Sequence, residues 1–160
     1  MIGMLFLGLY MHENKAYDLY PIHKSIGTLM LPLVCFRAIW RILKGWPEPT
    51  SPLHFLLHMA AKVSHFSLLA LTISLPISGV LMSALSGRGI HIFSFTLMAG
   101  NYNTDGKLIA LSETGASFFH QAHFLLSDAL IWLTLIHLGA ALVHHFWLKD
   151  QVLNRMLGLR

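Results

Sequence analysis

The sequence predicts an all-α protein, a four-helix transmembrane bundle whose first helix is truncated. Of its 160 residues, 55% are hydrophobic and only 11% are charged, whereas soluble domains carry about 25% charged residues. Three apolar stretches are long enough to cross a bilayer, which takes roughly 20 residues, and a fourth is about half that length. Eleven histidines are spread through this apolar chain, and ionisable side chains at membrane depth usually have a function. The size suits one domain over residues 1–160.

The first expected helix covers residues 1–11, which are apolar but too few to cross a bilayer. They lack the positive start and the small-residue cleavage site of a signal peptide. We therefore interpret them as the second half of a membrane helix that begins before Met1, the alternative being a short interfacial helix. The polar residues 12–21 form a connector, in which His12 is expected to be a solvated loop residue.

The second expected helix covers residues 22–44 and carries His23 at its entry. Its far end carries Arg37, Arg41 and Lys44 beside tryptophan. Arginine and lysine collect at cytoplasmic helix ends, and tryptophan marks the headgroup region. We therefore expect this helix to run from the outer face to the cytoplasmic face, followed by a proline-rich linker.

The third expected helix covers residues 54–85 and begins with polar positions before it becomes wholly apolar. His54, His58 and His65 lie at i, i+4 and i+11, close to one helix face. Such an array either binds a metal at the membrane edge or forms a polar face that meets headgroups or heme propionates. We favour the second interpretation.

A long connector and the fourth helix complete the chain. Connectors beyond about 15 residues are usually functional or locally structured, and we expect residues 90–98 to be a re-entrant or interfacial piece that lies over the bundle. The fourth helix, residues 117–148, then runs inward and ends at further cations, which predicts a cytoplasmic C-terminus.

The fourth helix carries His123 and His137, which are 14 residues apart. This interval places both imidazoles near one face, about 21 Å apart along the helix axis. His23 and His123 lie at one outer depth on two helices, as the two ligands of a bis-histidine heme iron must. His137 is expected to hold a second, inner heme, with either His65 or a histidine on the missing part of the first helix as its partner. His144, near the same face at the inner interface, is expected to touch a heme propionate or a quinone.

Other chemistries find little support in the residues. Cys35 is the only cysteine, which excludes a disulfide framework and a cysteine-ligated cluster. There is no phosphate-binding glycine loop, no nucleophile elbow and no basic tract for nucleic acid. Two alternatives remain open: a histidine-lined transporter or sensor for a transition metal, and a structural subunit that anchors a partner oxidoreductase.

Three stretches resemble the bacterial cytochrome b561 family, which is related to the cytochrome b subunits of nickel–iron hydrogenase and formate dehydrogenase. They are PIHKSIG with the downstream FRAIWR, then LALTISLPISGVLM, and finally His123, His137 and HLGAALVHHFWLKDQVLNRM. The resemblance covers nearly the whole chain and implies a four-helix bundle with two b hemes.

By this resemblance His23 and His123 bind the outer heme, and His137 is one ligand of the inner heme. The family's fourth ligand falls before Met1, so the inner iron is expected to be five-coordinate or bound by His65. The resemblance also implies transfer of single electrons between ubiquinone or menaquinone and a small-molecule or protein partner on the outer face, with superoxide as one candidate donor. The expected location is the bacterial inner membrane, in contact with lipid and compatible with a homo-oligomer.

Overall fold

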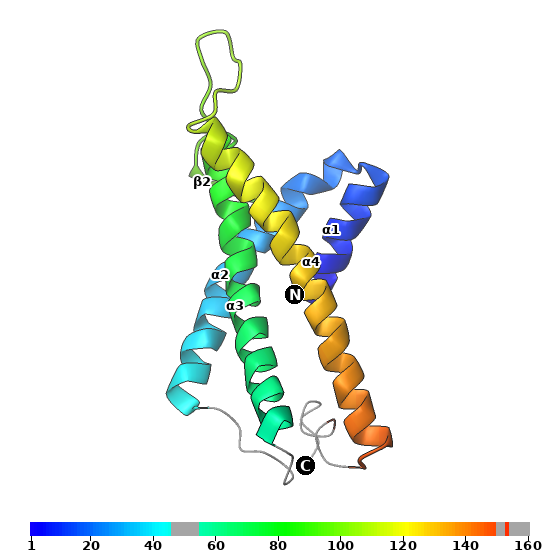
Figure 1. Cartoon of the computed structure of the whole chain (residues 1–160). Coiled ribbons are helices and arrows are strands. Elements are labelled where there is room, and N and C mark those ends of the chain that lie inside the picture. The colour runs from blue at the N-terminus through cyan, green and yellow to red at the C-terminus, as the bar shows by residue number, and fades with distance from the viewer. Residues whose placement is uncertain (46–54, 150–152, 154–160) are drawn as a thin grey trace.

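The computed structural model describes residues 1–45, 55–149 and 153. Its elements, in chain order, are α1 (Ile2–Asn14), the 3-10 turn η1 (Tyr17–Leu19), α2 (Tyr20–Lys44), α3 (Phe55–Leu85), β1 (Ile90–Ile92), β2 (Phe95–Met98) and α4 (Glu113–Phe146) (Figure 1). The proline-rich linker and His54 lie outside the described residues, so the array of three histidines predicted on the third helix is described only at His58 and His65.

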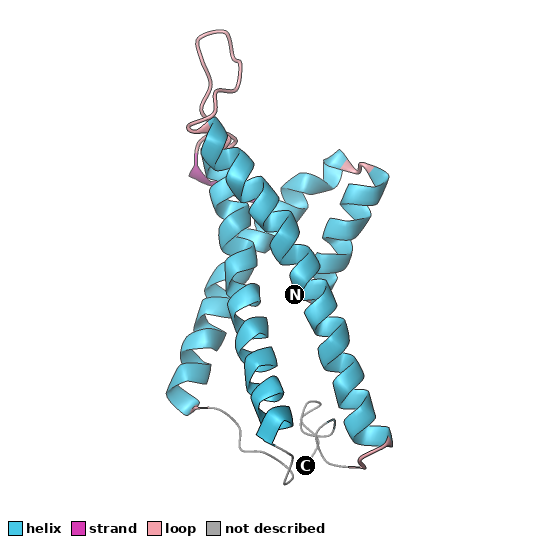
Figure 2. Ribbon diagram, in the orientation of Figure 1, coloured by secondary structure: helices cyan, strands magenta, loops and turns pink. Residues whose placement is uncertain are grey.

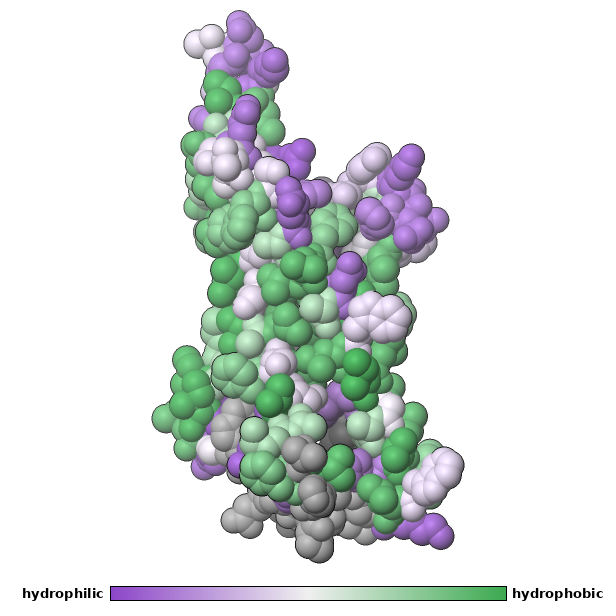
Figure 3. Space-filling view, viewed as in Figure 1, coloured by the Kyte–Doolittle hydropathy of each residue, from purple (hydrophilic) through white to green (hydrophobic). Residues whose placement is uncertain are grey.

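Three helical segments in the described part of the chain are long and apolar enough to cross a membrane: Tyr17–Lys44, Leu57–Leu85 and Glu113–Phe146. Figure 3 shows apolar side chains covering the middle of the molecule, with polar residues toward its two ends. The protein is therefore a helical membrane protein, as its composition predicts. The 13 residues of α1 make about 20 Å of helix, less than a bilayer core requires.

The first connector is shorter than the sequence predicted. α1 continues to Asn14, so His12 lies in the helix and not in a loop. The helix ends where Lys15 adopts a left-handed conformation with φ of 51°, a common way to stop a helix. The turn η1 then leads into α2, whose first turn contains Pro21. Proline is tolerated there because an N–H group in the first turn has no acceptor within the helix.

α3 packs against α4 more extensively than any other pair of elements. The two helices lie together near the end of the bundle that carries β1 and β2, which we call the outer end. They diverge toward the opposite end, which we call the inner end (Figure 1). α4 begins at Glu113, four residues before the predicted start, because the Ser112 side chain accepts a hydrogen bond from the Gly115 N–H at 3.1 Å. This N-cap satisfies one of the free amide groups of the first turn.

Residues 90–98 form a two-stranded antiparallel hairpin, which corrects the all-α prediction for this segment (Figure 2). The hairpin lies against α2, where Ser25 is only 2% exposed. The Ser25 hydroxyl accepts a hydrogen bond from the Phe93 N–H at 2.7 Å. Gly89 makes the entry possible, because its φ is +70° and a Cβ there would overlap the Met98 carbonyl oxygen. The segment thus covers the outer end of the bundle as a hairpin tied to α2.

Candidate functional site

The outer pair of histidines joins α2 to α4. His23 lies in the first turn of α2, and its ring centroid is 6.4 Å from that of His123, with the ring planes at 84°. Metal–imidazole bonds of about 2 Å place the ring centroids of two trans ligands roughly 6 Å apart. The separation of these two rings therefore suits one metal ion between them.

The hydrogen bonds of His123 determine which of its nitrogens is free. Its Nδ1 lies 3.1 Å from the Leu75 carbonyl oxygen, which only accepts, so Nδ1 carries the proton and donates it. The buried Ser78 hydroxyl, 3.0 Å from the same nitrogen, donates its own hydrogen to the Leu75 carbonyl at 2.7 Å. Nε2 of His123 therefore keeps its lone pair, as a histidine bound to a metal requires.

Two glycines allow the helices to approach the outer pair. A Cβ at Gly79 of α3 would lie 3.1 Å from Cε1 of His123, and a Cβ at Gly8 of α1 would lie 3.5 Å from Cε1 of His23. The His23 Nδ1 atom is buried and has no hydrogen-bond partner among the described residues. A buried nitrogen without a partner is unfavourable in an apolar bundle, and its presence beside His123 is consistent with a ligand-binding histidine.

The inner pair joins α3 to α4. The rings of His65 and His137 have centroids 5.2 Å apart and planes at 69°. The Ser64 hydroxyl forms a hydrogen bond with Nδ1 of His137 at 3.2 Å, which leaves Nε2 available as a ligand when Nδ1 is the donor. The rings are closer than in the outer pair, so an iron between them requires α3 and α4 to separate by about 1 Å.

The two serines were not singled out in the sequence, although a signal for them exists. Ser78 and Ser64 are 14 residues apart on α3, the same interval that separates His123 from His137 on α4. Because α3 and α4 are antiparallel neighbours, the equal intervals bring one serine to each histidine. A search for polar residues at this spacing on the neighbouring helix would have found both.

The other histidines lie around these pairs. His12 and His120 both contact the Phe124 ring, at centroid distances of 5.3 Å and 4.9 Å. His144 is half-buried in the last turn of α4, seven residues beyond His137. In the part of the chain that the structure describes, no group of three or more histidine, cysteine, aspartate or glutamate side chains is arranged to hold a metal ion. No observation thus favours the metal-transporter alternative.

Two cations lie close to each other, one at the start of α2 and one just before the hairpin. Lys24 follows His23 directly and is half-buried, and Arg88, which precedes the hairpin, is close enough for the two charges to repel each other. Like charges held together raise the local positive potential and attract small anions. Lys24 and Arg88 therefore form a positively charged area at the end of the bundle that carries the hairpin.

The donor set fits heme iron. Each pair offers two imidazoles from different helices, in an apolar bundle, and in each pair a serine contacts Nδ1 of the α4 histidine. Bis-histidine ligation with hydrogen bonds on the outer nitrogens is a common way to hold a heme in a helical bundle. The ligand roles of His23, His123, His65 and His137 remain predictions that this geometry supports.

Comparison with known proteins gives consistent matches. The family model described as prokaryotic cytochrome b561 matches residues 1–159. The chain is 34% identical to "Cytochrome b561 homolog 2" of Escherichia coli (strain K12), over 98% of this chain and 82% of that protein. It is 30% identical to "Probable superoxide oxidase CybB" of Yersinia pestis, over 85% of this chain and 73% of that protein. It is also similar to "Cytochrome b561 homolog 1" of Escherichia coli (strain K12), with 26% identity over 86% of this chain.

Proposed function

Because the chain belongs to the prokaryotic cytochrome b561 family, it is a heme-binding membrane protein of electron transport, and we propose that it passes single electrons between an outer-face partner and a membrane quinone. The observation that carries this proposal is the outer histidine pair, whose ring separation and free His123 Nε2 suit a heme iron. Bound heme supplies the one-electron chemistry, while the chain supplies ligands, spacing and electrostatics.

Two levels of ligands make a path through the bundle. His23 and His123 hold an outer b heme, and His65 and His137 hold an inner one. The 14 residues between His123 and His137 place the two levels about 21 Å apart along α4. A quinone, either ubiquinone or menaquinone, exchanges electrons with one of these hemes from the lipid phase.

The charges support one orientation in the bacterial inner membrane. Among the described residues, the end of the bundle opposite the hairpin carries only cations: Arg37, Arg41, Lys44, Lys62 and Lys149. The described residues of the hairpin end carry a balanced set: Lys15, Lys24, Arg88 and Lys107 with Glu13, Asp18, Asp105 and Glu113. By the positive-inside rule, the hairpin faces outward and the end of α4 faces the cytoplasm.

Superoxide is the outer-face donor that we propose. It is a small anion, and Lys24 and Arg88 form a pair of neighbouring cations at the end of α2 that carries His23. One similar protein carries the name "Probable superoxide oxidase CybB". In this reaction each superoxide loses one electron and leaves as O₂, two such electrons together with two protons reduce one quinone to quinol, and the cations raise the encounter rate without joining the chemistry.

The test is the reduced-minus-oxidised spectrum and heme-to-protein ratio of the purified protein and of single alanine variants. We expect two low-spin hemes, one of which is lost in His23→Ala and the other in either His65→Ala or His137→Ala. His91→Ala, in the outer hairpin, is the matched control and should keep both hemes. A wild-type protein without heme would refute the proposal, and retention of both hemes in His65→Ala would remove His65 from the inner site.

The donor is tested separately with Lys24→Gln. This variant should reduce quinone from superoxide more slowly at low salt, and its rate should depend less on ionic strength than the wild-type rate. Lys107→Gln, in the outer loop after the hairpin, is the control for a general loss of charge. Equal rates and equal salt dependence in Lys24→Gln and the wild type would argue against superoxide steering by these cations.

A further inference from the structure

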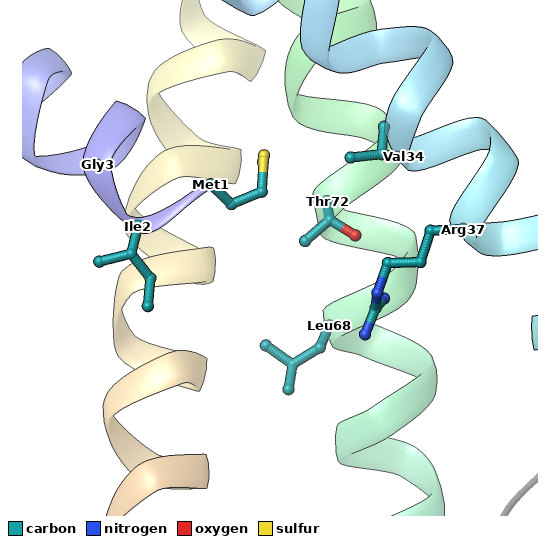
Figure 4. Close-up of a pocket in the computed structure, with 7 residues that line it drawn as sticks. All are labelled: Met1, Ile2, Gly3, Val34, Arg37, Leu68 and Thr72. Atoms are coloured by element: carbon teal, nitrogen blue, oxygen red, sulfur yellow. The ribbon is translucent and has the colours of Figure 1, made fainter. Parts of the chain in front are cut away.

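A cavity lies inside the bundle, between the levels of the outer and inner histidine pairs. It has a volume of about 580 Å³, within the range of about 300–1,000 Å³ that is usual for small-molecule sites. Its lining residues come from the start of the chain, from α2 and from α3, and are Met1, Ile2, Gly3, Val34, Arg37, Leu68 and Thr72. Figure 4 shows these side chains between α1 and α4 on one side and α2 and α3 on the other. The lining is apolar apart from Thr72, the amino group of Met1 and the Arg37 guanidinium, which points toward the space.

The inner histidine pair lies inward of the cavity along α3. His65 precedes Leu68 by three residues and Thr72 by seven, so these three side chains share one face of α3. On α2, Arg41 lies close enough to His65 for their charges to interact, and Arg37 is one turn further outward. On α3 the cavity lining thus begins one turn outward of His65.

Arg37 takes the place at the inner level that His23 takes at the outer level. The two residues are 14 positions apart on α2, about 21 Å along the axis and about 40° around it. The same interval relates the other two helices of the site, through Ser78 and Ser64 on α3 and through His123 and His137 on α4. The outer arrangement is thus repeated inward, with a guanidinium where the outer level has an imidazole.

The charge of Arg37 has no protein counterion in the described part of the chain. The carboxylates of residues 1–45 and 55–149 all lie nearer the outer end, and none is paired with Arg37. Arg37 also borders a smaller open recess with Phe36 and Trp40 on the surface of α2. A cation within a membrane span is unfavourable unless an anion or water compensates it.

We infer that Arg37 binds the carboxylate of an amphipathic ligand in this cavity, namely a propionate of the heme held by His65 and His137. A guanidinium forms two parallel hydrogen bonds with a carboxylate, which adds geometric specificity to the attraction between the charges. The apolar lining suits the macrocycle, and a propionate supplies the missing negative charge. A quinone headgroup offers only neutral carbonyls, which would leave the charge uncompensated. The inference rests on the proposed function, because it requires an inner heme.

The test measures how fast heme leaves the detergent-solubilised protein for excess apomyoglobin, together with the heme-to-protein ratio. The variants are Arg37→Gln, which removes the charge, and Arg37→Lys, which keeps the charge without the planar fork. Lys44→Gln is the matched control, because it makes the same change at the exposed end of the same helix. The His23→Ala and His137→Ala proteins identify which kinetic phase belongs to which heme.

Arg37→Gln is expected to lose the inner heme at least about tenfold faster than the wild type, the size expected for one charged hydrogen-bonded pair. Arg37→Lys should show a smaller change, while the outer heme and the Lys44→Gln protein should be unchanged. The outer heme spectrum and the helical circular dichroism verify that each variant is folded. If the Arg37→Gln protein does not fold, Arg37→Lys is the variant that tests the inference. It must then lose the inner heme faster than Lys44→Gln does.

Three results would overturn the inference. The first is an Arg37→Gln protein that loses its inner heme at the wild-type rate. The second is a raised KM for a short-chain quinone in the same variant, which would assign the cavity to quinone. A wild-type protein that contains only the outer heme would also overturn it and leave the outer site standing. A wild-type protein with no heme would instead refute the proposed function. Failure of the inference about Arg37 and failure of the proposed function therefore give different results.

Discussion

Replacing Gly79 with alanine is expected to weaken heme binding at the outer site even though it favours the helix. The new methyl group would lie 3.1 Å from Cε1 and 3.3 Å from Nδ1 of His123, whereas carbon atoms pack best about 3.5–4.0 Å apart. The ring must therefore shift by a few tenths of an ångström, against the hydrogen bonds that tie its Nδ1 to Leu75 and Ser78. Overpacking of this kind costs about 1–3 kcal/mol, which corresponds to an outer heme that binds roughly 5-fold to 150-fold more weakly.

The assay is a heme titration of the apoprotein, combined with thermal unfolding. Alanine is favoured over glycine in a helix by about 1 kcal/mol, so the apoprotein should be destabilised by about 1 kcal/mol less than the overpacking alone would cause. Gly139→Ala on α4 is the matched control, because nothing lies within 4 Å of a Cβ at that position. Outer heme binding in Gly79→Ala that equals that of the wild type and of Gly139→Ala would refute the reasoning that Gly79 sets the position of His123.

Three serine variants test hydrogen bonds at three places: the outer histidine pair, the hairpin and the start of α4. Ser78→Ala should weaken the outer heme by about 1 kcal/mol, seen as about a fivefold change in a heme titration, and an equal loss at the inner heme would contradict a local effect. Ser25→Ala leaves the Phe93 N–H without its acceptor, so amide exchange in residues 90–98 should become roughly tenfold faster; unchanged protection there would mean that the hairpin is held by other contacts. Ser112→Ala removes the N-cap of α4 and should lower stability by about 1 kcal/mol, measured as a lower thermal midpoint, and an unchanged midpoint would show that the cap contributes nothing.

The membrane helices and the depth of the outer pair could be predicted because they depend on local properties. The apolar runs that contain His23 and His123 are long, and their lengths and the helical rise place both residues near the outer entry. The start of α4 was predicted too late because Ser112 and Glu113 form a capped first turn within a polar stretch. Helix ends depend on such single hydrogen bonds, whereas helix existence depends on many residues.

The partners of each histidine could not be predicted with the same ease. The choice of His65 as the neighbour of His137 was open in the sequence, because it depends on how α3 is rotated against α4. Ser64 and Ser78 contact the two α4 histidines only because that rotation turns them inward. Helical spacing gives the interval between residues, but the packing of the helices decides what each residue faces.

The outer hairpin was missed for a related reason. Residues 90–98 alternate between apolar and polar positions over only a few residues, and their backbone is also held by a contact with Ser25, which lies 68 residues before Phe93. A tertiary hydrogen bond over this interval leaves no local signal in the sequence. The prediction that this piece lies over the bundle depended only on its place between two membrane helices.

The vertical spacing of the two histidine levels makes the protein sensitive to the membrane potential. An electron that moves from the outer to the inner level travels about 21 Å, or about 70% of a hydrocarbon core of about 30 Å. In a cell whose interior is negative this step works against the field, by about 1.6 kcal/mol for each 100 mV. In the proposed arrangement, inward electron transfer therefore adds to the potential difference, and an electron that returns outward dissipates it. The polarity of the bundle thus decides whether a turnover consumes or conserves the energy stored across the membrane.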